Sequence, residues 1–134
     1  RDLGKPQESK QKTSIQTPEV ATDPSFTEVK GELIPGFPNF PVYPGAKLKA
    51  SAKRNEETQA KGYRAKWETS GSVYEVMQWY LRELPKLGWT TKEPPNDPQA
   101  QGEQVAKFVK DNQEVTLIVE EEKPGETEII VDFP

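Results

Sequence analysis

The sequence predicts an α+β fold, a two-layer sandwich in which one main helix packs on an antiparallel sheet in the order ββαβββ. Three observations lead to this prediction. One segment carries apolar residues at helical spacing, several shorter segments alternate apolar and polar residues, and turn signatures with proline and glycine separate them. A single amphipathic helix buries its apolar stripe against one face of a sheet, which gives two layers.

The chain of 134 residues divides into three parts by composition. Residues 1–25 are polar and lack apolar periodicity, so we expect a disordered or extended tether. Residues 26–45 mix prolines with aromatic side chains, and we expect a strap that packs on a folded surface, with a flexible linker as the alternative. Residues 46–134 are expected to form the α+β domain. The strap residues expected to pack are Phe26, Leu33, Ile34, Phe37, Phe40 and Val42.

The first two strands of the domain follow a turn. In the segment Tyr43-Pro44-Gly45-Ala46, proline stands second and glycine third, as a type II turn requires. Residues 47–53 and 63–68 then alternate apolar and polar side chains, with a polar loop at 55–62 between them. The pattern predicts a hairpin whose strands carry cations on their polar faces.

The main helix is predicted over residues 72–87. Ser72 and Glu75 are spaced as a capping box, and Gly88 stands where a left-handed residue is favoured after a helix. Pro85 removes a backbone donor, so we expect the last turn to be kinked or loosened. The apolar stripe consists of Val73, Val76, Met77, Tyr80, Leu81, Leu84 and Leu87.

The segments after the helix predict a series of adjacent strands. Strands are predicted at 104–110, 114–121 and 127–133. The turn Lys123-Pro124-Gly125-Glu126 separates the last two of them. A short segment at 89–92 is an additional candidate strand, which the order ββαβββ does not include.

Composition excludes several classes of function. The chain has no cysteine and no histidine, so it cannot supply a disulfide, a thiol nucleophile, an imidazole base or the usual zinc ligands. Its net charge of −4 argues against binding to nucleic acid or to an anionic membrane surface. The acidic residues lie on predicted polar faces or in loops, without the paired carboxylates of a glycosidase. We therefore expect no enzyme activity, no catalytic residues and no cofactor.

Three oxygen-rich groups, at residues 96–97, 111–114 and 120–122, raise the question of a calcium site. None of them has the ligand count or the spacing of an EF-hand loop. The sequence therefore favours solvated turns at these positions and predicts no metal site.

Aromatic residues are the best candidates for binding. At 100° per residue, Trp79 lies about 130° from the centre of the helix stripe. Either the strap covers its ring, or the ring is exposed as a binding hot spot. Trp67 and Trp89, which lie on predicted strands, are expected to pack in the core or at its edge.

Charge is segregated along the chain. Residues 46–66 carry seven cations and two anions, whereas residues 111–134 carry eight anions and one cation. If the two stretches are neighbours in the sheet, they form cross-strand ion pairs. If they lie at opposite edges, the molecule is a dipole suited to head-to-tail assembly. The candidate protein-interaction residues are Trp79, Phe26, Phe37, Phe40, Lys47, Lys49 and Lys53.

Three strings of the sequence resemble a recurring domain of bacterial envelope proteins, often lipoproteins. They are the segment Pro41-x-Tyr43-Pro44-Gly45-Ala46, the segment Thr69-x-x-Ser72-x-x-Glu75-Val76, and the segment Trp79-Tyr80-x-x-x-Leu84-Pro85-x-x-Gly88-Trp89. The resemblance covers residues 41–133 and implies a location outside the cytoplasm, but it carries no catalytic residue to this chain. The lipid-modified cysteine is absent, so any membrane anchor is expected upstream of Arg1.

The sequence thus predicts a non-catalytic, extracytoplasmic protein-interaction or assembly domain on a proline-rich tether, in the periplasm or at the cell surface. Its expected partner is a protein, with a second copy of the chain in head-to-tail contact as one option, and it meets a membrane only through an upstream anchor. The alternative is a small-ligand or glycan-binding module that uses exposed aromatic side chains such as Trp79.

Overall fold

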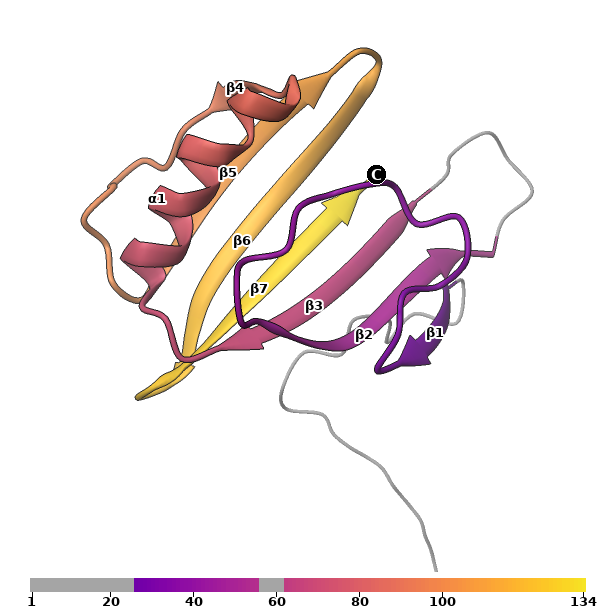
Figure 1. Cartoon of the computed structure of the whole chain (residues 1–134), viewed down its shortest axis with the longest axis horizontal. Coiled ribbons are helices and arrows are strands. Elements are labelled where there is room, and N and C mark those ends of the chain that lie inside the picture. The colour runs from indigo at the N-terminus through magenta and orange to yellow at the C-terminus, as the bar shows by residue number, and fades with distance from the viewer. Residues whose placement is uncertain (1–25, 56–61) are drawn as a thin grey trace, which may run out of the picture.

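The computed structural model describes residues 26–55 and 62–134, so the predicted tether at 1–25 and most of the predicted polar loop lie outside the described residues. Seven strands form one antiparallel sheet in the order β1-β2-β3-β7-β6-β5-β4 (Figure 1). Helix α1 covers β5 and β6, and the strap between β1 and β2 crosses in front of β7 and β3. The elements are β1 (Phe26–Lys30), β2 (Lys47–Arg54), β3 (Tyr63–Thr69), α1 (Val73–Glu83), the 3-10 helix η2 (Pro85–Leu87), β4 (Thr90–Glu93), β5 (Glu103–Lys110), β6 (Gln113–Lys123) and β7 (Glu126–Phe133).

The predicted two-layer sandwich of order ββαβββ is wrong. The chain is mostly antiparallel sheet, with one short α-helix, and its order is βββαββββ. The 11 residues of α1 make a helix of only about 16 Å, whereas seven strands span about 29 Å across the sheet. One helix therefore covers part of the sheet, and the strap covers another part. The prediction missed β1 because its five alternating residues lead directly into the proline-rich strap.

Helix α1 has the predicted start and an earlier end. The Ser72 hydroxyl accepts the Glu75 N–H at 3.0 Å, and the Glu75 carboxylate accepts the Ser72 N–H at 3.1 Å, which completes the capping box. Regular helix stops two residues before Pro85, which opens a 3-10 turn that ends at Gly88 with φ of 96°. Leu87 is 49% exposed and leaves the apolar stripe. Among the residues that the structure describes, no helix is long and apolar enough to cross a membrane.

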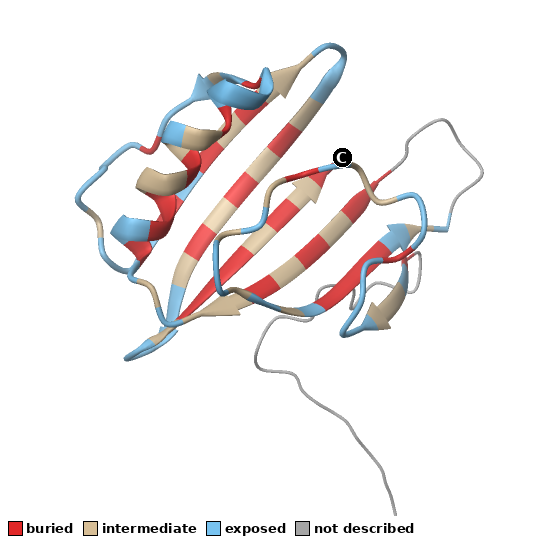
Figure 2. Cartoon of the chain, viewed as in Figure 1, coloured by how far each residue is buried: buried red, intermediate tan, exposed pale blue. Residues whose placement is uncertain are grey.

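The strands sort their side chains onto two faces. Figure 2 shows buried positions alternating with less buried ones along β3 and β6. The inner face, toward α1 and the strap, holds the main core. Trp67 and Trp89 are 3% and 4% exposed, which confirms that both belong to it. Other core residues are Val76, Met77, Tyr80, Phe108, Leu117 and Val131.

The outer face pairs the segregated charges. Because β3 lies beside β7, Arg64 contacts Asp132 at 3.2 Å and Lys66 contacts Glu128 at 3.6 Å. The basic and acidic stretches of the chain are therefore neighbours, and cross-strand pairing accounts for their separation in the sequence. The arrangement removes the reason for expecting a charge dipole.

Candidate functional site

The strap packs on the inner face of the sheet through two phenylalanines. Phe37 and Phe40 insert among five aromatic rings, with nearest centroid distances of 5.7 Å for each. Ile34 is also buried, whereas Leu33 and Val42 are 45% and 41% exposed. The strap therefore docks on its own domain, although Leu33 and Val42 do not pack against it. The five rings are those of Tyr63, Trp67, Tyr80, Trp89 and Phe133.

Two hydroxyl groups attach the strap by hydrogen bonds. The Tyr80 hydroxyl donates to the Pro41 carbonyl at 3.0 Å and accepts the Tyr43 N–H at 3.2 Å. The Ser51 hydroxyl donates to the Glu32 carbonyl at 2.7 Å and accepts the Ile34 N–H at 2.7 Å. Burial raises the pKa of Tyr80 above its ordinary value, and the hydrogen bond from Tyr43 opposes that rise. Each hydroxyl thus satisfies two backbone groups that a proline-rich segment cannot pair within itself.

Glycine is required at two points of the strap. At Gly36, φ is 89°, and an added Cβ would lie 2.8 Å from the Tyr63 hydroxyl. At Gly45, φ is 84° within the predicted turn, in which the Ala46 N–H donates to the Tyr43 carbonyl at 3.0 Å. The close approach and the turn both exclude a larger residue.

Trp79 is half-buried and contacts the strap. Its ring meets the Tyr43 ring edge to face, with centroids 5.6 Å apart, and lies 4.9 Å from the Tyr80 ring. The strap therefore covers part of Trp79, which matches the first of the two alternatives. A role for Trp79 in binding a partner stays a prediction.

The other predicted aromatic residues are used inside the molecule. Phe26 is buried against the outer face, where the guanidinium carbons of Arg54 and Arg64 lie 5.0 Å and 4.6 Å from its ring centroid. Phe37 and Phe40 belong to the strap anchor described above. In this conformation all three rings are occupied by contacts within the chain.

The three predicted lysines do not form one site. Lys49 pairs with Glu68 at 3.8 Å, and the Lys53 ammonium lies 5.9 Å from the Tyr63 ring centroid. Lys47 is exposed at the start of β2. The β-bulge in β2 changes the register between these lysines, so their side chains contact different residues.

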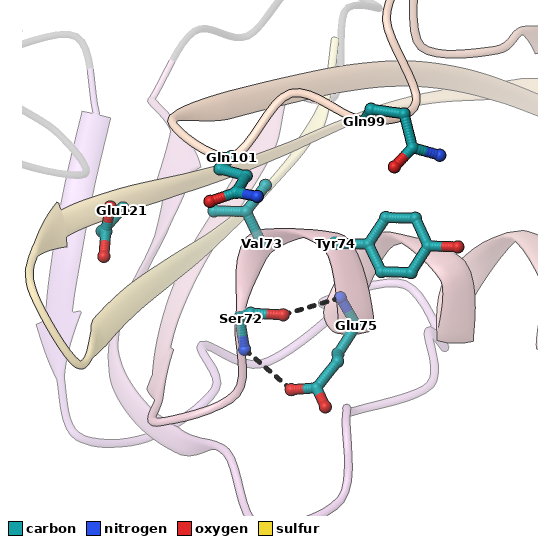
Figure 3. Close-up of a pocket in the computed structure, with 7 residues that line it drawn as sticks. All are labelled: Ser72, Val73, Tyr74, Glu75, Gln99, Gln101 and Glu121. Atoms are coloured by element: carbon teal, nitrogen blue, oxygen red, sulfur yellow. Dashed lines mark hydrogen bonds between the residues drawn. The ribbon is translucent and has the colours of Figure 1, made fainter.

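A cleft of about 480 Å³ opens where α1 begins (Figure 3). Three segments line it: the first turn of α1, the loop that leads into β5, and the C-terminal part of β6. Its volume lies within the range of small-molecule sites. The lining residues are Ser72, Val73, Tyr74, Glu75, Gln99, Gln101 and Glu121.

Polar side chains and one aromatic ring line the cleft. Ser72 and Glu75 are engaged with each other in the capping box. Figure 3 shows the Tyr74 ring below Gln99, and Gln101 above the first turn of α1. The Tyr74 side chain is 41% exposed, so its ring is accessible from solvent. The cleft thus offers two amides and an aromatic ring to a ligand.

Gln104 holds the loop that supplies both glutamines. It is 3% exposed, and its amide nitrogen donates to the Pro98 carbonyl at 3.0 Å and to the Ala100 carbonyl at 2.7 Å. The Gln99 N–H donates to the Asp97 carboxylate at 3.0 Å. These bonds give the loop a fixed shape although it has no regular secondary structure.

Sequence reasoning did not single out any residue of this cleft as a ligand contact. Gln99 and Gln101 lie in an irregular loop whose position depends on the buried side chain of Gln104. Tyr74 offered the one signal, because it is an aromatic residue outside the apolar stripe of an amphipathic helix. The predicted site residues lie elsewhere, on the strap, on β2 and further along α1.

A family model described as START domain-like matches residues 49–127, which is more than half of the chain. The match begins within β2 and ends within β7, so it includes α1 and the whole cleft. No curated protein and no solved structure matches the sequence.

Proposed function

Because the chain belongs to a START domain-like family, we propose that it is a small-ligand-binding module whose ligand occupies the cleft at the start of α1. The family favours a ligand-binding role over an enzymatic or a purely structural one. The observation that carries the proposal is the exposed Tyr74 ring beside the Gln99 and Gln101 amides, in a cleft of suitable volume.

The chemistry of the lining indicates the class of ligand. Amide groups donate and accept hydrogen bonds without carrying charge, and an aromatic face binds C–H surfaces. Glu121 and Glu75 disfavour anionic ligands in the same cleft. An uncharged ligand with hydroxyl or amide groups and a flat apolar face, such as a sugar unit of a glycan, satisfies these conditions.

Titration with soluble N-acetylglucosamine oligomers and with neutral oligosaccharides tests the proposal. We expect NMR signals of the Tyr74 backbone amide and of the Gln99 and Gln101 side-chain amides to shift in a saturable way. Tyr74→Ala is expected to weaken binding about tenfold because the aromatic contact is lost.

Tyr74→Phe is the matched variant, since it keeps the ring and is expected to keep most of the affinity. Leu87→Ala, at an exposed apolar residue beyond the end of α1, is expected to leave binding unchanged. Equal affinity of Tyr74→Ala and the native protein would place the ligand elsewhere, and the absence of saturable shifts with every sugar would reject a glycan.

A protein partner is the second candidate, favoured by an apolar row on the outer face of the sheet. Val105, Ile118 and Ile130 lie directly opposite one another on β5, β6 and β7, and Val105 is 40% exposed. Adjacent exposed apolar side chains mark protein contacts more often than isolated ones do. Light scattering at increasing concentration, compared with Ile118→Lys, tests for self-association through this row.

We also propose that the domain works outside the cytoplasm, in the periplasm or at the cell surface. The resemblance of the segments at 43–46 and 79–89 to envelope domains supports this location. Fractionation of the source cells, followed by antibody detection, tests it, and recovery with the cytosol would reject it.

A further inference from the structure

Four glutamates form a row across the outer face of the sheet. They are Glu68 on β3, Glu128 on β7, Glu120 on β6 and Glu103 on β5, and each lies directly opposite the next in the strand register. Like charges that face each other on neighbouring strands destabilise a sheet. Lys49 and Lys66 offset part of this charge through Glu68 and Glu128, and a bound cation or proton would reduce the repulsion that is left.

Three carboxylates come together along this row. One oxygen from each of Glu120, Glu122 and Glu128 lies within 4.8 Å of the other two. The first two belong to β6 and the third to β7, so the ladder between neighbouring strands creates the group. Glu122 and Glu128 also line a hollow of about 320 Å³, together with Glu68, Glu126 and the cations Lys49, Lys66 and Lys123.

Glu128 is the buried member of the group, with 4% exposure. Its Oε2 lies 3.6 Å from the Lys66 ammonium, but its Oε1 is buried without a hydrogen-bond partner. A buried carboxylate oxygen without a donor costs free energy. Its neighbour Glu122 cannot help when both groups are ionised, because a carboxylate carries no hydrogen to donate.

We propose that Glu120, Glu122 and Glu128 bind one divalent cation of the hard, oxygen-preferring class, such as Ca²⁺. Ca²⁺ holds oxygen ligands at about 2.3–2.6 Å, so oxygens up to about 5 Å apart can contact the same ion. Lys66 contacts Glu128 and offsets one of the three negative charges. The two other lysines of the hollow, Lys49 and Lys123, pair with Glu68 and Glu126, which lie outside the group of three. Softer metals are disfavoured because the chain has no histidine or cysteine.

The pKa of Glu128 is raised to about 7, first by burial and then by hydrogen bonding with Glu122, while Lys66 opposes the rise. The pKa of Glu120 is also raised, by burial first and then by Glu103.

Calorimetric titration of the full chain with CaCl₂, after treatment with EDTA, tests the proposal. We expect one ion per chain with a dissociation constant on the order of 10⁻⁴–10⁻³ M, as in extracellular calcium modules. We also expect CaCl₂ to raise the melting temperature, whereas KCl of equal ionic strength does not. Glu128→Gln is expected to weaken binding at least about tenfold.

If Glu128→Gln does not fold, Glu122→Gln tests the site instead, because Glu122 is exposed and its replacement leaves the core intact. Glu126→Gln is the matched control, since Glu126 lines the same hollow but lies outside the group of three. Unchanged affinity in Glu122→Gln and Glu128→Gln, equal losses in all three variants, or no Ca²⁺-specific effect would each overturn the site. The cleft near α1 involves none of these residues, so this outcome is independent of the proposed ligand.

Discussion

Single side chains decide how the strap is held, and Tyr80 is the clearest case. Its ring belongs to the apolar stripe of α1, stacks on Phe40 and is 1% exposed. Its hydroxyl forms hydrogen bonds with the Pro41 carbonyl and the Tyr43 N–H of the strap. Helical spacing predicts the buried ring. The partners of the hydroxyl lie more than 35 residues earlier in the chain, beyond the reach of any local pattern.

Tyr80→Phe is expected to destabilise the protein by about 1–2 kcal/mol, because it leaves a partly buried N–H and a partly buried carbonyl without their hydrogen-bond partner. The variant keeps the ring and the core packing. Hydrogen exchange should become faster at the Tyr43 amide than at amides in β6. Tyr74→Phe, which removes a hydroxyl from an exposed ring on the same helix, is expected to change stability little, and equal effects of the two variants would contradict this role.

At the scale of elements, the strap acts as part of the layer that covers the sheet. The sequence revealed its apolar content, the turn at its end and the capping box of α1, because each of these depends on a few neighbouring residues. It did not reveal which side chains point inward. An irregular segment has no fixed periodicity, so Leu33 and Ile34 were expected to pack alike, whereas only Ile34 does.

Phe40→Ala is expected to cost about 3–5 kcal/mol, because it leaves a cavity among buried rings. Leu33→Ala, at an exposed residue of the same strap, is expected to cost less than about 0.5 kcal/mol. Urea denaturation of both variants measures the difference. Comparable midpoints would mean that the strap contributes little to the stability of the domain.

At the scale of the whole molecule, the inner face of the sheet packs against α1 and the strap, and the outer face carries the charged side chains. The sequence predicted both faces through alternation, and it predicted the neighbouring cationic and anionic stretches as one of two options. The row of glutamates could not be predicted, because its members become opposite neighbours only once the order β3-β7-β6-β5 is known. The cleft depends in the same way on elements from distant parts of the chain.

The charged face is expected to make stability depend on pH. The pKa of Glu128 rises from an ordinary 4.5 to about 7 in the folded protein, mainly through burial. The folded state therefore holds a proton that the unfolded chain releases, so this contribution to stability is present below about pH 4.5 and is lost as the pH rises to about 7. Glu128→Gln cannot ionise and lacks this loss.

Urea denaturation in EDTA between pH 4.5 and pH 8 measures the effect. The stability of the native protein relative to Glu128→Gln should fall as the pH rises through this range and then level off. A difference that stays constant with pH would show that the carboxyl ionises normally in the folded state.

The contacts of the strap also set the order in which the protein can assemble. The rings of Phe37 and Phe40 contact the Phe133 ring, and β3 pairs with β7. The strap and β3 therefore make part of their contacts with β7, the last strand in the sequence. Contacts so distant in sequence close slowly because the intervening chain must first be ordered. During synthesis the contacts of both phenylalanines with Phe133 cannot form until β7 has emerged. Pulse-labelled hydrogen exchange during refolding should accordingly find the Tyr43 amide among the last to become protected.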